Sequence, residues 1–369
     1  MNFWRHIPKP IVGLSPMDGV TDAPFRFIAA KYGKPDLILT EFVNVEGLAR
    51  NAVVMLEDFL YTESERPIVA QIYGSEPESF YKIAVLVCAL GFDGIDINMG
   101  CPAKNVASRG CGAALIRTPD LAKEILRQVK RGVRDWAEGR EVEDLGLKPR
   151  MALRVQRMNA ERNAAKPPER KTLPVSVKTR IGYDSVVVED WVRHLLEEEP
   201  AAISLHGRTL KQMYTGAADW EAIARATEII HQSSTLALGN GDILSLADAA
   251  EKIRASGVDG VLIGRAAMGN PWIFAEKDAW KNKWSAAEKT PLSESIVATA
   301  ERFSVLLEHS RYFEQVKGPE RFSAMRKHFG HYCKGLRGAA ELRNKMFQSH
   351  SSAEVGEILA EYTDIEGRL

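Results

Sequence analysis

Cys101 is the residue best placed for chemistry in this sequence. It lies in the segment Asn98-Met99-Gly100-Cys101-Pro102, where glycine and proline restrict the backbone of a turn. An unperturbed thiol has a pKa of about 8.5, so a protonated Cys101 could act as a general acid, whereas a basic neighbour would make it a nucleophile. A third interpretation is a buried thiol that only fills the core. The spacing alone leaves these interpretations open.

Two glycine-rich turns could bind a phosphate group. Gly239-Asn240-Gly241-Asp242 and Gly264-Arg265 each follow a short apolar run. Glycine lets backbone N–H groups approach an anion closely, and a following helix adds its positive N-terminal end. The alternative is two structural turns with Arg265 in solvent. Because the turns follow two successive runs, we expect them to form a phosphate site together.

Three further polar side chains, Gln71, Lys178 and His206, also lie at the ends of apolar runs. Lys178 could stabilise negative charge on the pyrimidine edge of a reduced flavin, but it could also be a Schiff-base amine or form a salt bridge. Gln71 offers an amide donor and acceptor to the same ring edge. His206 could hydrogen-bond the flavin or a phosphate, or serve a structural role.

The elements that must position these residues are short apolar runs that alternate with helix-like segments. Eight such runs predict an α/β fold, a (β/α)8 TIM barrel, in which the C-terminal ends of the strands meet at the active-site face. The main alternative is a doubly wound open sheet. That fold usually has a glycine-rich dinucleotide turn after its first strand, and Ser15-Pro16-Met17-Asp18-Gly19 stands there instead. The runs are Ile11–Leu14, Leu37–Thr40, Ile68–Ile72, Gly94–Ile97, Val175–Val177, Ala202–Leu205, Leu236–Leu238 and Gly260–Ile263.

The length of 369 residues predicts two domains, because single domains rarely exceed about 300 residues. We expect the barrel over residues 1–276 and a small all-α helical bundle over residues 277–369. A charged stretch, 136–172, precedes the fifth strand; we expect a solvated insertion or an extra helical hairpin there rather than an RNA-binding arm. The periodic pieces of the bundle are Ser293–Phe313, Pro319–Lys334, Arg337–Ser349 and Ala353–Tyr362.

Composition excludes an overall electrostatic field, since 49 Lys and Arg residues balance 49 Asp and Glu residues. Any nucleic-acid contact must therefore be local. The sequence has neither a signal peptide nor a membrane-length apolar run, so we expect a cytoplasmic protein without a membrane partner. The other cysteines, Cys88, Cys111 and Cys333, lack metal-ligand spacing, and we expect no metal. The oligomeric state is not readable, and a monomer is compatible with the sequence.

Taken in order, the segments around these residues resemble the tRNA-dihydrouridine synthases. The matching positions run from residue 12 to about residue 272 and cover the whole predicted barrel. The segments are Ser15-Pro16-Met17-Asp18-Gly19-Val20-Thr21-Asp22-Ala23-Pro24-Phe25-Arg26, Asp96-Ile97-Asn98-Met99-Gly100-Cys101-Pro102-Ala103-Lys104, Val177-Lys178-Thr179-Arg180-Ile181-Gly182-Tyr183, His206-Gly207-Arg208-Thr209 with Gln212 and Tyr214, Asn240-Gly241-Asp242-Ile243, and Gly257–Trp272.

The resemblance implies an FMN enzyme in which NADPH, or NADH, reduces the flavin. Hydride then passes from flavin N5 to C6 of a uracil in the D-loop of tRNA, and Cys101 protonates C5. Asn98 and Arg180 would hold the edge of the extracted uracil. The residues that would contact FMN are Pro16, Met17, Asp18, Gln71, Lys178, His206, Asn240, Gly241, Asp242, Gly264 and Arg265.

A basic run in the predicted bundle could contact tRNA phosphates, although such runs are usually solvated helix faces. Its candidate cations are Arg326, Lys327, Lys334, Arg337 and Arg343. Two other functions stay open. One is an FMN barrel acting on a free pyrimidine, such as a dihydroorotate or dihydropyrimidine dehydrogenase, which would not need this run. The other is a non-catalytic RNA-binding barrel. The sequence does not indicate which uridine is reduced, nor does it exclude ribosomal RNA.

Overall fold

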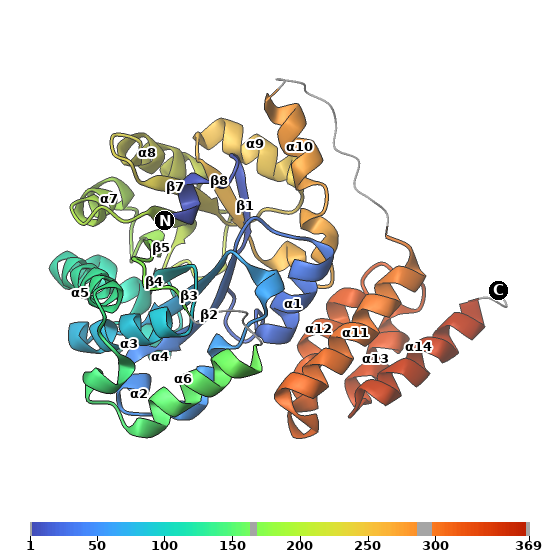
Figure 1. Ribbon diagram of the computed structural model, residues 1–369. Helices are drawn as coiled ribbons and strands as arrows, with labels where there is room; N and C mark the ends of the chain where they lie inside the picture. The colour runs from blue at the N-terminus through green and yellow to red at the C-terminus, as the bar shows by residue number, and fades with distance from the viewer. Residues whose placement is uncertain (1, 163–167, 286–296, 367–369) are drawn as a thin grey trace.

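A closed barrel of eight parallel strands in chain order forms the centre of the molecule (Figure 1). The computed structural model describes residues 2–162, 168–285 and 297–366. Pairing of β1 with β8 closes the barrel, which confirms the (β/α)8 fold and excludes the open sheet. The strands are β1 Ile11–Leu14, β2 Ile38–Asn44, β3 Ile68–Tyr73, β4 Gly94–Met99, β5 Val175–Gly182, β6 Ala202–Thr209, β7 Leu236–Asn240 and β8 Gly260–Ile263.

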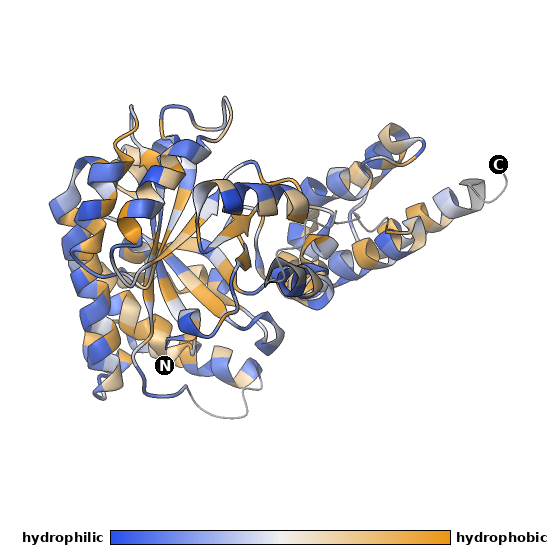
Figure 2. Cartoon of the chain, turned by 90° about the horizontal axis from the view of Figure 1, so that it is seen from above, coloured by the Kyte–Doolittle hydropathy of each residue, from blue (hydrophilic) through white to orange (hydrophobic). Residues whose placement is uncertain are grey.

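Helices surround the barrel and turn their apolar faces towards the strands (Figure 2). Several begin with a capping residue or a proline in the first turn, as Asp22 and Pro24 do for the first helix. These helices are α1 Ala23–Tyr32, α2 Val45–Ala49, α3 Pro77–Ala89, α4 Lys104–Ala107, α5 Pro119–Ala137, α6 Pro149–Glu161, α7 Val188–Leu196, α8 Trp220–Ile230 and α9 Leu246–Ser256.

The barrel interior has an apolar floor and a polar mouth. At the N-terminal end of the strands, Trp4 packs in a buried cluster with side chains such as Leu39, Val69 and Leu262. At the opposite end, the interior carries polar side chains on several strands. Strand residues alternate between the two faces of the sheet, so the polar residues of neighbouring strands meet inside the barrel.

Several strands extend further than the apolar runs predict. The fifth strand continues to Gly182 and the sixth to Thr209, so Lys178, Arg180 and His206 lie within strands rather than after them. The boundaries differ because polar side chains that line a barrel mouth break an apolar run without ending the backbone ladder. The predicted order along the chain is unaffected.

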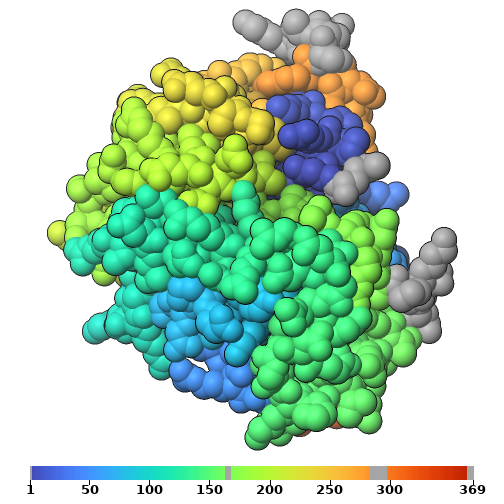
Figure 3. All heavy atoms as spheres, turned by 60° about the vertical axis from the view of Figure 1, so that its left-hand side comes forward, coloured from blue at the N-terminus to red at the C-terminus, as the bar shows by residue number. Residues whose placement is uncertain are grey.

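The described parts of the charged stretch, 136–162 and 168–172, lie against the outer wall of the barrel (Figure 3). The side chain of Asn159, on α6, donates to the carbonyl of Ala89 at 2.9 Å, and Arg162 donates to the carbonyl of Leu90 at 2.8 Å. Both carbonyls lie at the C-terminal end of α3, so this part of the stretch is fastened to the barrel. Residues 163–167 lie outside the described part of the chain.

The C-terminal part is a helical bundle, as expected. Its helices are α11 Thr299–Lys317, α12 Arg326–Tyr332, α13 Ala339–Gln348 and α14 Ser352–Glu366. The predicted piece Pro319–Lys334 is a 3-10 helix, Pro319–Met325, followed by α12. Residues 293–296, the predicted start of the bundle, lie outside the described residues. Helix α10, Lys277–Ser285, instead packs on the barrel, because Trp280 belongs to the barrel core.

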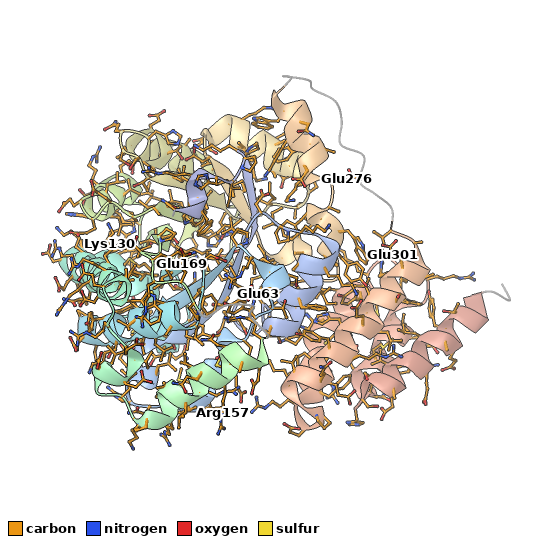
Figure 4. All side chains as sticks on the ribbon, viewed as in Figure 1. Glu63, Lys130, Arg157, Glu169, Glu276 and Glu301 are labelled. Atoms are coloured by element: carbon orange, nitrogen blue, oxygen red, sulfur yellow. The ribbon has the colours of Figure 1, made fainter. Side chains whose placement is uncertain are left out.

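The bundle packs against α1. Ile28 of α1 is buried in the core of the bundle, and the Phe27 ring lies tilted against the Tyr312 ring with 4.3 Å between ring centroids. Glu301, in the first turn of α11 (Figure 4), accepts a hydrogen bond from Trp272 Nε1 at 3.0 Å. No helix in the described ranges is long and apolar enough to cross a membrane.

Candidate active site

The mouth of the barrel gathers the predicted site residues because alternate residues of adjacent strands face inward. In the β-ladder, Asn98 is opposite Lys178, and Arg180 is opposite His206. His206 is in turn opposite Asn240. Side chains of paired residues on one face lie next to each other, so the structure brings these five predicted residues together.

Beneath the mouth, Asp96 is the centre of a buried hydrogen-bond network. Its carboxylate accepts from Gln71 Nε2 at 2.7 Å and from Ser176 Oγ at 2.6 Å. Burial raises the pKa of Asp96 to about 6, although the bonds from Ser176 and Gln71 oppose the rise. Asn98 Nδ2 donates to Gln71 Oε1 at 3.0 Å. Gln71 has no exposed surface, so its contact with a flavin stays a prediction.

Asn98 also shapes the turn that carries Cys101. Its side-chain oxygen accepts from the backbone N–H of Gly100 at 3.0 Å and of Cys101 at 2.9 Å. The Cys101 side chain is buried at the edge of the mouth, and burial raises the pKa of its thiol. The cations Arg180 and Lys178 lower that pKa but do not outweigh burial. Cys101 is therefore a thiol at neutral pH, the form that a proton donor needs.

Arg180 is a buried cation that clamps this turn. Its Nε donates to the carbonyl of Gly100 at 2.7 Å. Its Nη1 donates to the carbonyls of Thr209 and Met213 at 3.0 and 3.1 Å. Burial lowers the pKa of Arg180 to about 10, so the guanidinium is still charged at neutral pH. Its contact with a uracil stays a prediction.

Lys178 points towards the glycine turn after β7. Its ammonium donates to Asn240 Oδ1 at 3.1 Å, and Asn240 Nδ2 donates to the carbonyl of Leu262 at 2.7 Å. Burial and the nearby charge of Arg180 lower the pKa of Lys178 to about 8, while the charge of Asp96 opposes the shift. Asn240 thus orients the side chain of Lys178, whose lowered pKa makes the ammonium easier to deprotonate than that of an ordinary lysine.

Asp242 joins two arginines beside the mouth. Its carboxylate accepts from Arg208 Nη2 at 2.5 Å and from Arg265 Nη2 at 2.7 Å. Burial would raise the pKa of Asp242, but these guanidinium groups outweigh it and lower the pKa. Burial and the surrounding cations lower the pKa of His206 to about 2, so its ring is neutral. Arg208 was not among the predicted site residues, and the signal that could have revealed it is its position two residues after His206, on the same face of β6.

A glycine cradle lies between these charges. Gly241 has a φ of +125°, and a Cβ there would lie 2.8 Å from Ala218 Cβ and 3.0 Å from the His206 ring. A Cβ on Gly264 would lie 3.2 Å from the sulfur of Met17. One carboxylate, Asp242, faces two guanidinium groups, which leaves net positive charge at the cradle. The close approach to the backbone that glycine permits and the charge balance both fit a phosphate group.

We expect Gly241→Ala to weaken flavin binding because alanine disfavours this φ and meets the His206 ring. The free energy of unfolding should fall by roughly 1–3 kcal/mol, and the FMN Kd should rise roughly tenfold. Fluorescence titration of the apoprotein measures the Kd. Gly257→Ala is the control, since Gly257 also has positive φ, at the end of α9, but its nearest neighbour is 4.0 Å away. Equal FMN affinity in both variants would contradict the assignment of the cradle.

The turn after β1 completes the mouth. The N–H of Met17 donates to Thr21 Oγ1 at 2.9 Å, which closes the turn that contains Pro16 and Asp18. Desolvation raises the pKa of Asp18, and the charge of Lys327 from the bundle opposes this rise. Met17 lies beside Gly264, so the structure brings the predicted cofactor contacts after β1, β7 and β8 to one face.

The five basic residues predicted for tRNA differ in their surroundings. Lys334, Arg337 and Arg343 are exposed on the bundle. Arg326 is partly buried on α12, and its Nε has no hydrogen-bond partner among the described residues. Lys327 donates to Asp22 Oδ2 at 3.2 Å, so it contacts the barrel. The phosphate contacts of these residues stay predictions.

Comparisons with known proteins identify the same family over nearly the whole chain. The dihydrouridine synthase (Dus) family model matches residues 13–137 and 155–366. A protein of Staphylococcus aureus (strain COL) named "Probable tRNA-dihydrouridine synthase" is 33% identical over 368 residues, which cover 98% of this chain and 95% of that protein. The "Probable tRNA-dihydrouridine synthase 2" of Bacillus subtilis (strain 168) is 33% identical over 98% of this chain and 96% of its own length.

A solved structure, ligand-free DHODH from Eimeria tenella, shares the fold. Its TM-score is 0.50 at 14% identity, and the match covers 76% of this chain and 88% of that one. The family match covers both the barrel and the bundle, with a gap only at residues 138–154 of the charged stretch. This chain belongs to the dihydrouridine synthase family.

Proposed function

We propose that this protein reduces the C5=C6 bond of a uridine in tRNA, with FMN as its cofactor and NADPH as the electron donor. The substrate is the one in the names of the relatives. The observation that carries the proposal is the position of Cys101, whose backbone is held by Asn98 at the mouth that also contains the glycine cradle.

The residues at the mouth fit FMN. Gly241 and Gly264 would admit its phosphate, and Arg208 and Arg265 would supply the positive charge. Lys178 would face the pyrimidine edge of the ring from the strand between the cradle and Cys101. FMN, when bound, supplies the hydride, which no protein side chain can provide.

Cys101 would donate the proton to the uracil carbon C5. The hydrogen bonds to Asn98 fix the backbone of its turn, and Arg180 holds the same turn from the other side through Gly100. The remaining N–H groups of Arg180 would donate to a carbonyl of the uracil. The base would first have to leave the RNA stack in order to enter the mouth. The protein thus contributes position, charge and one proton.

The helical bundle would hold the tRNA body. Its exposed cations Lys334, Arg337 and Arg343 lie on the same domain that packs against α1, next to the mouth. Phosphate contacts of this kind supply affinity that depends on salt. We propose the helices α11 to α14 as the tRNA-binding part and the barrel together with α10 as the catalytic part.

Reconstitution tests the function directly. Purified protein with FMN, NADPH and unmodified tRNA should form dihydrouridine, detected by nucleoside mass spectrometry with position mapping. A free pyrimidine should not react under the same conditions. Turnover of free pyrimidine without action on tRNA would favour the dehydrogenase alternative, and failure to bind flavin would favour a non-catalytic RNA-binding barrel.

A further inference from the structure

Lys327 links the helical bundle to the barrel at the start of α1. Its ammonium lies 3.2 Å from Asp22 Oδ2, and the side chains of Lys327 and Asp22 are 28% and 5% exposed. The other carboxylate oxygen of Asp22 accepts from the N–H of Phe25 and caps α1. The lysine is therefore held at a domain junction, largely withdrawn from the solvent that a tRNA phosphate would approach.

Asp22 directly follows the turn that would contact the flavin. Its neighbour Thr21 is fully buried and bonds through Oγ1 to both the N–H and the carbonyl of Met17, at 2.9 and 3.2 Å. The carbonyl of Thr21 accepts from Arg26 Nη1 at 2.7 Å. Met17 in turn lies beside Gly264 of the cradle. A continuous set of contacts thus leads from Lys327 to the predicted flavin site.

The charges around Lys327 strengthen this link. Three carboxyl groups of the barrel mouth, Asp18, Asp22 and Glu41, lie in its field. Burial and the charge of Asp22 raise the pKa of Glu41 to about 7, and Lys327 and Arg26 oppose that rise. Without the ammonium, these carboxyl groups would repel one another and the turn between them would lose a restraint.

A cation site at this junction is a weaker interpretation. His309 and His328 are fully buried, and one nitrogen of each lies within 4.8 Å of an Asp22 oxygen. Nitrogens of both rings have no hydrogen-bond partner among the described residues. However, the ammonium of Lys327 already neutralises Asp22, the sole carboxylate of that group, so a metal ion would have to displace it.

We propose that Lys327 is a positioning residue: through Asp22 it holds the flavin-binding turn in register with the bundle, rather than contacting a tRNA phosphate. This inference rests on the proposed function, because it requires that the turn contacts FMN. It assigns to the bundle a second task besides binding RNA, namely to complete the cofactor site of the barrel.

The test separates FMN affinity from the salt dependence of tRNA binding. Lys327→Met should raise the FMN Kd of the apoprotein roughly tenfold, because losing one partner of a mostly buried ion pair leaves the other charge unpaired. The slope of log affinity for tRNA against log salt should not change. If Lys327 contacts a phosphate, the FMN Kd is unchanged instead and the slope falls by about one.

Four further variants control the result. Asp22→Asn keeps the helix cap and removes only the charge, so it should reproduce the effect of Lys327→Met. The double variant should bind FMN no more weakly than either single one, since both remove the same contact. Lys327→Arg keeps the positive charge and should bind FMN with the wild-type affinity. Arg337→Met removes an exposed cation of the bundle and should change the tRNA salt slope without changing the FMN Kd.

Thermal unfolding shows whether each variant is folded. If Lys327→Met is not folded, Asp22→Asn replaces it as the test of the ion pair. Unchanged FMN affinity in both Lys327→Met and Asp22→Asn overturns the inference and leaves the proposed function intact. A wild-type protein that forms no dihydrouridine and binds no FMN overturns both.

Discussion

Cys101→Ala is expected to lose product formation by roughly 10²–10⁴-fold, the range over which a positioned general acid contributes. The variant should still bind FMN and should be reduced by NADPH at the wild-type rate, because the thiol acts only on the uracil. Stopped-flow absorbance of the flavin follows both half-reactions separately. Reduction should be unchanged, and reoxidation by tRNA should be slow.

Cys111→Ala provides the matched control for this experiment. Cys111 is buried in the same small apolar cluster as Cys101 and Val106, and burial also raises the pKa of its thiol. Because Asn98 holds the backbone of Cys101 and not that of Cys111, the flavin of Cys111→Ala should be reoxidised by tRNA at the wild-type rate. Wild-type reoxidation in Cys101→Ala, or equal losses in the two variants, would remove Cys101 from the chemistry.

The second large effect is expected for Lys178→Met, which removes the cation at the pyrimidine edge of the proposed flavin. Loss of one preorganised charge that stabilises a developing anion should slow flavin reduction roughly 10²–10³-fold. The contact with Asn240 orients this charge, so Asn240→Ala should produce a smaller loss in the same step. The rate of flavin reduction under anaerobic conditions measures both.

Lys178 also sets a pH dependence. Its pKa is lowered to about 8, so its positive charge is fully present below that pH and is lost as the pH rises through it. Flavin reduction by the wild type should therefore decline above about pH 8, and Lys178→Met should be slow without that decline. Lys130→Met is the control, because burial also lowers the pKa of Lys130, but its ammonium bonds to the carbonyl of Glu199 on the outer wall. A decline that persists in Lys178→Met would assign it to another group.

The barrel could be predicted because its strands are marked by short apolar runs and its turns by glycine and proline. The runs at Ile11 and Gly260 coincide with the observed strands, since both faces of these strands are buried. Strand ends were less predictable where the interior becomes polar, as at Lys178 and His206. A polar residue on the inner face of a barrel has the same local sequence signal as one in a loop.

Contacts between distant residues could not be predicted from the sequence. Asp96 occurs in a recognisable segment, but its bonds to Gln71 and Ser176 depend on the register of three strands. The same holds for Asp242, which joins Arg208 of β6 to Arg265 after β8. Lys327 was predicted from its charge alone, whereas its partner Asp22 lies 305 residues away in the chain.

The apolar floor of the barrel has a kinetic consequence. Trp4 and the side chains around it fill the N-terminal end of the interior, so within the described chain the flavin site opens towards the mouth. The electron donor and the RNA would then use the same opening. Flavin reduction and entry of the uracil would then take place one after the other, without a complex that contains both the electron donor and the RNA.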